Sequence, residues 1–281
     1  MLTVERNLMP LDEQMPEGLE KQFNSHGYGF TSAVIAKCDE LSMYNKHFWR
    51  MPTPEFPVQI NGADTKIDFI LRHTHFPGYL IAECKKVDNR YSSWCFFKDP
   101  YLNYADGYVC DSLHKDDNTL KHNLRPLQHF HECYNIAFAL KKNDGKSEKT
   151  DGRDAIEKAV TQLCKGLNGF IQKFKEKKDQ LENGWYYFLP VLFTTAKLFV
   201  CNANLKETSG NGLLGIKEED VHETNIVIYN YSQSASIKNS TFVFTPEDLR
   251  KYHQLEYIRS IAVVTYEGIE KFLMADTIMN R

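Results

Sequence analysis

Three short apolar runs separated by turn motifs constrain the fold of this chain more than any other feature. The runs are Phe56–Ile60, Lys66–Arg72 and Tyr79–Lys85, and each has the length of a typical β-strand. The linkers between them, at 61–64 (NGAD) and 75–78 (HFPG), carry the glycine, asparagine and proline residues that favour tight turns. Consecutive strands joined by tight turns predict an antiparallel meander.

Ionisable residues gather where the second and third of these strands meet. Period-two alternation puts Asp68 on one face of the second strand with Ile70 and Arg72, opposite Ile67, Phe69 and Leu71. The same alternation puts Glu83 and Lys85 on one face of the third strand. We therefore expect Asp68, Glu83 and Lys85 to lie close together.

Two carboxylates that point at one spot repel each other and are costly to bury without a cation. Mg²⁺ or Mn²⁺ would relieve this conflict at Asp68 and Glu83, because these ions prefer oxygen ligands and also bind substrate phosphate. Lys85 could then orient or deprotonate an attacking water and offset the negative charge that develops on phosphorus.

The motif consists of Ile67-Asp68, then 14 intervening residues, then Glu83-Cys84-Lys85, and we expect a helix before it and a helix and a strand after it. This arrangement resembles that of the PD-(D/E)XK restriction-endonuclease-like nucleases. The resemblance covers roughly 18–86 and 153–201, and Ile67 stands where the motif has proline. It implies an α/β (α+β) core with a central mixed β-sheet flanked by helices. It also implies Mg²⁺-dependent phosphodiester hydrolysis that leaves a 5′-phosphate, with Asp68 and Glu83 as metal ligands and Lys85 beside the water.

The resemblance further implies contributions from two helices. Glu20, near the start of the first helix, is the match for an additional metal-binding carboxylate, and Gln162 is the match for a polar residue on the helix after the motif. Lys158 and Lys165 share the face of Gln162, and with Lys86 they are candidates for substrate binding. The alternative is that Glu20 is an exposed first-turn carboxylate and that Gln162 and Lys165 belong to a solvated face.

Two stretches of helical periodicity frame the strands. In 18–42, apolar residues at steps of four and seven predict a helix, and Gly27 and Gly29 either break it in two or allow a close approach by another group. In 155–181 the apolar stripe is continuous, with Asp154 as a plausible N-cap. This second helix ends near Glu176-Lys177-Lys178, which also spells E-x-K but is a solvated charge run.

We predict a single domain over 1–281, with its core at 18–86 and 153–201, an insertion at 87–152 and a C-terminal α/β extension at 202–281. After 184 we expect strands at 185–193, 197–201, 225–231, 241–244 and 260–265, with a helix after 245 and a last helix at the end.

The insertion holds two further candidates. The aromatic stretch 91–108 could stack on unpaired bases, form a partner surface or make a small core of its own. A group of potential zinc ligands lies nearby, but no P-C-x-x-C follows it, so ordinary histidines are the alternative: His122, His129, His131 and Cys133.

Bulk composition limits the class of protein. The seven cysteines include no CxxC pair, and no apolar run approaches the roughly 20 residues of a membrane span. We therefore expect a cytoplasmic protein without membrane contact. The formal net charge of −3 means that nucleic-acid affinity must come from local basic surface or from partners.

The sequence thus predicts a Mg²⁺-dependent (or Mn²⁺-dependent) DNA endonuclease, of a class that suits the nuclease effector of a bacterial defence or restriction system. The chain shows no helix-turn-helix or zinc-finger reader, so we expect a homo-oligomer or a partner subunit to contribute specificity. A catalytically silent interaction subunit and an RNA-directed nuclease are the alternatives.

Overall fold

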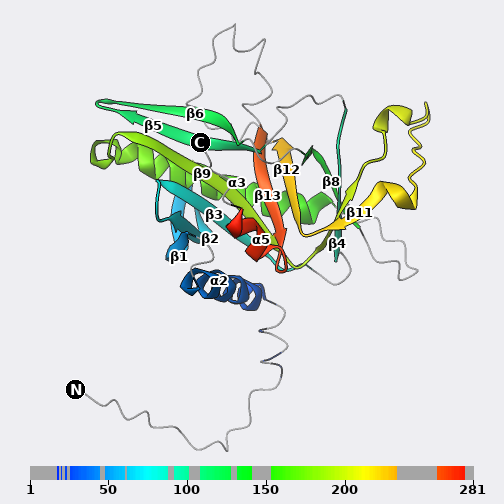
Figure 1. Ribbon diagram of the computed structural model, residues 1–281, viewed down its shortest axis with the longest axis horizontal. Coiled ribbons are helices and arrows are strands. Elements are labelled where there is room, and N and C mark those ends of the chain that lie inside the picture. The colour runs from blue at the N-terminus through cyan, green and yellow to red at the C-terminus, as the bar shows by residue number, and fades with distance from the viewer. Residues whose placement is uncertain are drawn as a thin grey trace, which may run out of the picture.

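A computed structural model describes residues 18, 20, 23, 26–44, 48–60, 62–87, 92–100, 108–127, 132–140, 153–232 and 258–275. Within this part the fold is α+β, with a large mixed β-sheet and few helices (Figure 1). The expected strand at 241–244, the helix after 245, His129 and His131 lie outside the described residues. No helix in the described ranges is both long and apolar enough to cross a bilayer.

The main sheet has nine strands. Seven of them follow the order β1-β2-β3-β9-β13-β12-β7, and the β5–β6 hairpin joins it through β9. Their bounds are β1 (Trp49–Ile60), β2 (Ala63–His73), β3 (Gly78–Lys85), β5 (Tyr108–Asp116), β6 (Thr119–Leu127), β7 (Cys133–Tyr134), β9 (Gly184–Thr194), β12 (Ile226–Ser232) and β13 (Ile258–Thr265).

The predicted antiparallel meander is confirmed, because β1 pairs antiparallel with β2 and β2 pairs antiparallel with β3. The first strand begins at Trp49 and not at Phe56. Prolines at 52, 54 and 57 hid this extension from sequence patterns. They are tolerated because β1 ends the strand order and pairs only with β2.

A second, four-stranded sheet is built from β11 (Val221–Thr224), β10 (Lys197–Cys201), β4 (Ser93–Phe97) and β8 (Ile136–Leu140), in that order. The parallel neighbours β3 and β9 both leave the main sheet at their carboxyl ends, and the chain re-pairs as the parallel neighbours β4 and β10. The predicted insertion is therefore rich in strands, and its β5 belongs to the main sheet.

In the described ranges, three α-helices cover the main sheet: α2 (Tyr28–Met43), α3 (Arg153–Glu176) and α5 (Ile269–Met274). On one face, α2 and α5 share an apolar core with side chains such as Phe69 and Leu80. On the other, α3 packs over Ile70 and Ile81, and it runs across the sheet from the β5–β6 hairpin to β12. Short 3-10 turns complete the described structure: Lys178–Gln180, Leu205–Glu207 and Glu218–Asp220.

The first helical segment is interrupted as the glycines suggest, because α2 begins at Tyr28 with Gly27 at its N-cap. Gly29 also allows a close approach, since a Cβ there would lie 3.2 Å from the Phe23 ring. The decoy sequence Glu176-Lys177-Lys178 is exposed at the end of α3, as expected for a solvated charge run.

Helix α3 lies unusually close to β1 and β2. A Cβ on Gly169 would lie 2.8 Å from the Val58 Cβ, and one on Gly166 would lie 2.9 Å from the Ile67 Cγ1. Ile67 thus faces α3, in the same apolar core as Ile70, and the predicted placement of Ile67 opposite Ile70 is wrong. The period-two alternation is interrupted at Asp68, which lies opposite Glu55, a residue whose φ of 46° departs from strand geometry.

Candidate active site

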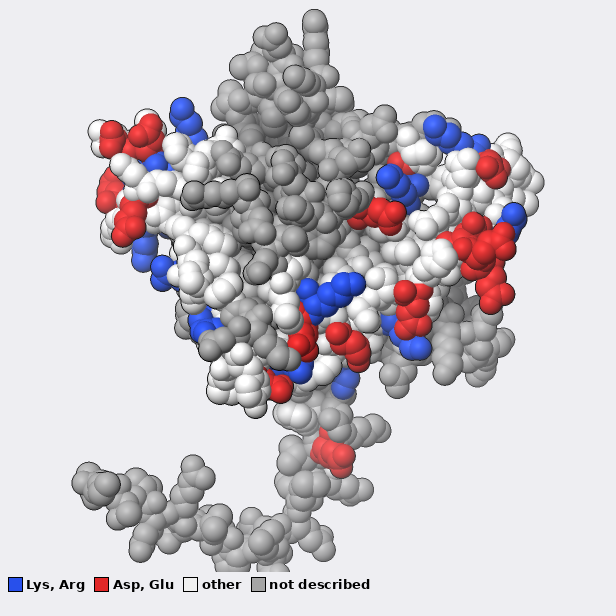
Figure 2. All heavy atoms as spheres, viewed as in Figure 1, with Lys and Arg blue, Asp and Glu red and all other residues white. Residues whose placement is uncertain are grey.

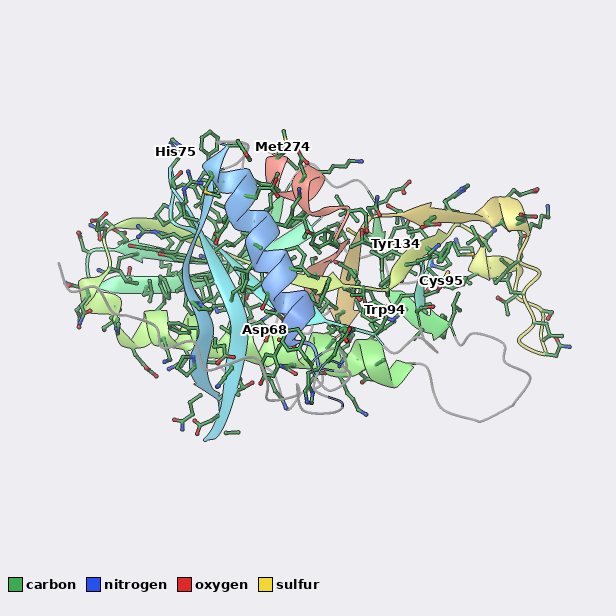
Figure 3. The ribbon with its side chains drawn as sticks, turned by 90° about the horizontal axis from the view of Figure 1, so that it is seen from below. Asp68, His75, Trp94, Cys95, Tyr134 and Met274 are labelled. Atoms are coloured by element: carbon green, nitrogen blue, oxygen red, sulfur yellow. The ribbon has the colours of Figure 1, made fainter. Side chains whose placement is uncertain are left out.

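Asp68 and Glu83 lie side by side where β2 and β3 separate. The paired register ends at Phe69 opposite Ala82, and one further step along each strand reaches Asp68 and Glu83. Beyond that point the Asp68 side chain replaces a backbone carbonyl as the hydrogen-bond acceptor between the strands: its Oδ2 accepts a hydrogen bond from the Cys84 backbone N–H at 2.7 Å. Asp68 is therefore held against the strand that carries Glu83. Figure 3 labels Asp68 near one end of helix α2.

Glu83 is a carboxyl group in an environment that disfavours its charge. Its side chain is buried, with 6% exposure. Burial, and then the neighbouring charge of Asp68, raise the pKa of Glu83 to about 9, although Lys85 and a hydrogen bond from Gln162 act in the opposite direction. At neutral pH Glu83 therefore holds a proton unless a cation replaces it.

The pKa of Asp68 is raised as well, first by partial burial and further by the charge of Glu55. The Cys84 N–H and the Lys85 ammonium group act in the opposite direction but do not cancel the shift. Both carboxyl groups thus have raised pKa values at one spot, which is the electrostatic conflict that a divalent cation resolves.

Lys85 ends β3 on the same face as Glu83. Tyr79 and Ile81 pack on the α3 side of the sheet, whereas Leu80 and Ala82 pack on the α2 side, so the predicted alternation of β3 is confirmed. The Lys85 backbone carbonyl accepts a hydrogen bond from the Thr195 N–H at 3.2 Å, which anchors the strand end to the β9–β10 junction.

Gln162 reaches the site from α3. Its side chain hydrogen-bonds Glu83, so the structure brings together two residues that lie on separate elements. Lys158 and Lys165 lie four residues before and three residues after Gln162, and both are exposed. Lys86, which follows β3, is exposed too. The three lysines are thus exposed and close in sequence to Lys85 or to Gln162.

Glu20 is described as an exposed residue before α2. Among the residues that the structure describes, no group of three or more His, Cys, Asp or Glu side chains is close enough to hold a metal ion. Glu20 is therefore not brought to Asp68 and Glu83. The available protein ligand set is a pair of carboxylates, which suits Mg²⁺ or Mn²⁺ because Mg²⁺ keeps several waters and uses one or two carboxylates.

Glu55 is a neighbour of the site that sequence patterns missed. In the β1–β2 register it falls opposite Asp68, between Pro54 opposite Phe69 and Phe56 opposite Ile67. Its backbone φ of 46° is unusual for a residue other than glycine, and its carboxylate pairs with Lys66 at 3.3 Å. The position of Glu55 beside Asp68 could have been predicted from the sequence only by extending the first strand through its prolines.

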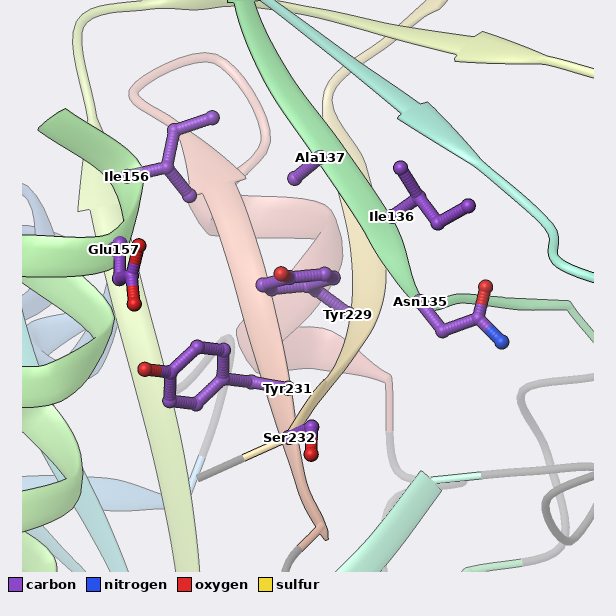
Figure 4. A pocket seen from close by; sticks show the side chains of 8 residues that line it. All are labelled: Asn135, Ile136, Ala137, Ile156, Glu157, Tyr229, Tyr231 and Ser232. Carbon is purple, nitrogen blue, oxygen red and sulfur yellow. The ribbon is translucent and has the colours of Figure 1, made fainter. Parts of the chain in front are cut away.

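A hollow of about 220 Å³, separate from Asp68 and Glu83, opens beside the N-terminal part of α3, between β8 and β12 (Figure 4). Tyr229, Tyr231 and Glu157 line it, and the Tyr231 hydroxyl lies 3.1 Å from the Thr161 hydroxyl. Its lining holds one carboxylate, so the charge conflict that distinguishes Asp68 and Glu83 is absent from this hollow.

Of the potential zinc ligands, the structure describes His122 and Cys133, and neither belongs to a group of described residues that could hold a metal ion. His122 Nε2 lies 2.8 Å from Asp111 Oδ1, deep in the protein, and Cys133 belongs to β7. His122 is thus part of a buried ion network within the described structure.

No family model, curated protein or solved structure matches this chain. Asp68, Glu83, Lys85 and Gln162 are therefore the residues whose geometry indicates a function.

Proposed function

We propose that this protein is a Mg²⁺-dependent (or Mn²⁺-dependent) endonuclease that hydrolyses phosphodiester bonds of DNA, with a site of the PD-(D/E)XK type. The observation that carries the proposal is the pair of adjacent carboxyl groups with raised pKa values, Asp68 and Glu83. Lys85 at the same strand end and Gln162 from α3 complete the set that the sequence motif leads one to expect.

Asp68 and Glu83 would hold the cation, which supplies charge neutralisation for the phosphate and acidifies bound water when present. The Cys84 N–H fixes Asp68, and Gln162 orients Glu83. Lys85 orients the attacking water and offsets the charge on phosphorus. The water oxygen bonds to phosphorus as the P–O3′ bond breaks, so the products carry a 5′-phosphate and a 3′-hydroxyl group.

The distribution of charged side chains favours contact with nucleic acid over only part of the surface. Acidic side chains gather at the outer end of the small sheet, where the turn Glu218–Asp220 is entirely acidic (Figure 2). Exposed lysines follow Lys85 in sequence or flank Gln162 on α3 instead: Lys86, Lys158 and Lys165. We propose that the phosphate backbone approaches along the side that carries these lysines.

The test is cleavage of plasmid DNA and of labelled single-stranded DNA, duplex DNA and RNA, with Mg²⁺, with Mn²⁺ and with EDTA. Asp68→Ala and Lys85→Ala should each lower the rate by at least about 10²-fold, as for loss of a key electrostatic group. Lys178→Ala, in the exposed E-x-K decoy, is the matched control and should cleave like the wild type.

Cleavage that survives both Asp68→Ala and Lys85→Ala would remove this site from consideration. Absence of cleavage on every substrate would indicate a catalytically silent interaction subunit. Preferential cleavage of RNA would keep the site and change the substrate.

A further inference from the structure

An open cavity of about 750 Å³ lies at the carboxyl edge of the main sheet. It is bounded by the first turns of α2, the β9–β10 junction, the β11–β12 junction and the turn between β13 and α5. Its volume is within the range of about 300–1,000 Å³ that is usual for ligand sites. The cavity has no role in the arrangement of Asp68 and Glu83.

The cavity and the carboxylate pair share the same strand ends. Lys85 is paired with Thr194, which lines the cavity, and the Lys85 carbonyl accepts the Thr195 N–H at 3.2 Å. The Val87 N–H in turn donates to the Thr195 hydroxyl at 3.0 Å. The opening therefore adjoins the strand end that carries Glu83 and Lys85.

The topology also favours ligand binding at this edge. Three adjacent strands, β3, β9 and β13, run parallel, and their carboxyl ends meet here. In open α/β sheets, ligands bind outside the carboxyl ends of parallel strands.

The lining is suited to a flat, uncharged group with hydrogen-bond donors. Phe30 and Tyr266 contribute aromatic rings, and Tyr266 is 39% exposed. Glu223 and Glu267 contribute carboxylates, against one cation, Lys197. The excess of carboxylates disfavours a phosphate inside the cavity, whereas carboxylates accept hydrogen bonds from amino groups such as cytosine N4.

We propose that this cavity receives one unpaired nucleobase with an exocyclic amino group, from a DNA strand whose phosphate lies at Asp68 and Glu83. Stacking on Tyr266 holds the base, and the carboxylates of Glu223 and Glu267 read its amino edge. This inference rests on the proposed nuclease function and gives it a substrate class: single-stranded DNA, or duplex DNA with a base out of the stack.

The test measures binding separately from cleavage. Fluorescein-labelled oligo(dA), oligo(dC), oligo(dT) and a duplex of the same length, all with phosphorothioate linkages, are titrated with the full chain in Mg²⁺ by fluorescence anisotropy. Oligo(dA) and oligo(dC) should bind about tenfold more tightly than oligo(dT) or the duplex.

Tyr266→Ala should weaken binding of oligo(dA) about tenfold, because base stacking on an aromatic side chain is lost. Tyr266→Phe should bind like the wild type, since stacking needs no hydroxyl group. Tyr44→Ala removes an exposed tyrosine at the far end of α2 and is the matched control.

The outcomes separate the two proposals. If Tyr266→Ala binds oligo(dA) like the wild type while Asp68-dependent cleavage persists, the cavity proposal is wrong and the nuclease proposal stands. Equal affinity for oligo(dT) and oligo(dA) would overturn the amino-group preference. If no nucleic acid is bound or cleaved, both proposals fail.

Discussion

The described part of the protein holds two sites with buried acidic side chains, and their electrostatics are opposite. Asp111 of β5 is 1% exposed, but it forms an ion pair with Arg259 at 3.0 Å and a hydrogen bond with His122 at 2.8 Å. Burial alone would raise the pKa of Asp111, yet Arg259 and His122 outweigh it and lower the pKa. At Glu83, burial and Asp68 prevail over Lys85, and the pKa is raised.

This difference separates a structural ion network from a candidate active site. Asp111 joins the β5–β6 hairpin to the core strand that carries Arg259, and Lys175 Nζ lies 3.3 Å from His122 Nδ1. Its charge is balanced within the protein. Asp68 and Glu83 have raised pKa values instead, because burial and neighbouring carboxylates outweigh Lys85. This is the arrangement expected where a cation and a substrate complete the site.

The largest effect should come from breaking the balanced network. Asp111→Ala leaves Arg259 buried without its carboxylate, and we expect the free energy of unfolding to fall by about 3–5 kcal/mol. Urea denaturation monitored by circular dichroism measures this. A loss below about 1 kcal/mol would mean that the network contributes little to stability.

The opposite change should follow at the unbalanced site. Glu83→Gln removes a carboxyl group whose pKa is about 9 in the folded protein and 4.5 as a reference, so it should stabilise the metal-free protein at pH 7 by about 2–3 kcal/mol. The same substitution should abolish cleavage. Destabilisation by Glu83→Gln at pH 7 would contradict the raised pKa.

The two sites should also differ in the pH dependence of stability. Because the pKa of Glu83 is raised on folding, its contribution is fully present below pH 4.5 and is lost as the pH rises through about 9. Because the pKa of Asp111 is lowered, its contribution is present above its usual pKa and is lost as the pH falls. Denaturation from pH 2 to pH 9 should show a flatter alkaline limb in Glu83→Gln and a flatter acidic limb in Asp111→Ala.

Added Mg²⁺ should reduce the difference between the two sites, because it would supply Asp68 and Glu83 with a compensating cation. Mg²⁺ at a hundredfold excess over its dissociation constant would stabilise the wild type by about 2.7 kcal/mol. Asp68→Ala should lose this gain and Asp111→Ala should keep it, as measured by the Mg²⁺-dependent shift in Tm at constant ionic strength. An equal shift in wild type and Asp68→Ala would place the cation elsewhere.

The smallest effect should come from an exposed ion pair beside the site. Lys66 and Glu55 are 66% and 59% exposed, so Lys66→Ala should change the free energy of unfolding by less than about 1 kcal/mol. A loss as large as that of Asp111→Ala would show that burial is not what distinguishes the ion pairs.

Much of the meander and of the candidate site could be predicted because both depend on local sequence. Turn residues at 61–64 and 75–78 set the hairpins, and alternation in β3 set the shared face of Glu83 and Lys85. Alternation failed at Ile67, because its side chain packs against Gly166 of α3, and local sequence does not determine a contact between distant segments. Glu55 was missed because prolines concealed the start of β1.

The sequence by itself determined which residues carry charge, which strands are joined by tight turns and which helix is amphipathic, since these depend on neighbours in the chain. Only the tertiary structure decided that Gln162 meets Glu83 and that β13 lies beside β9. It also decided that cationic neighbours lower the pKa of Asp111 while burial raises the pKa of Glu83. A pKa depends on burial and on charges brought from distant segments, and this environment exists only once the chain has folded.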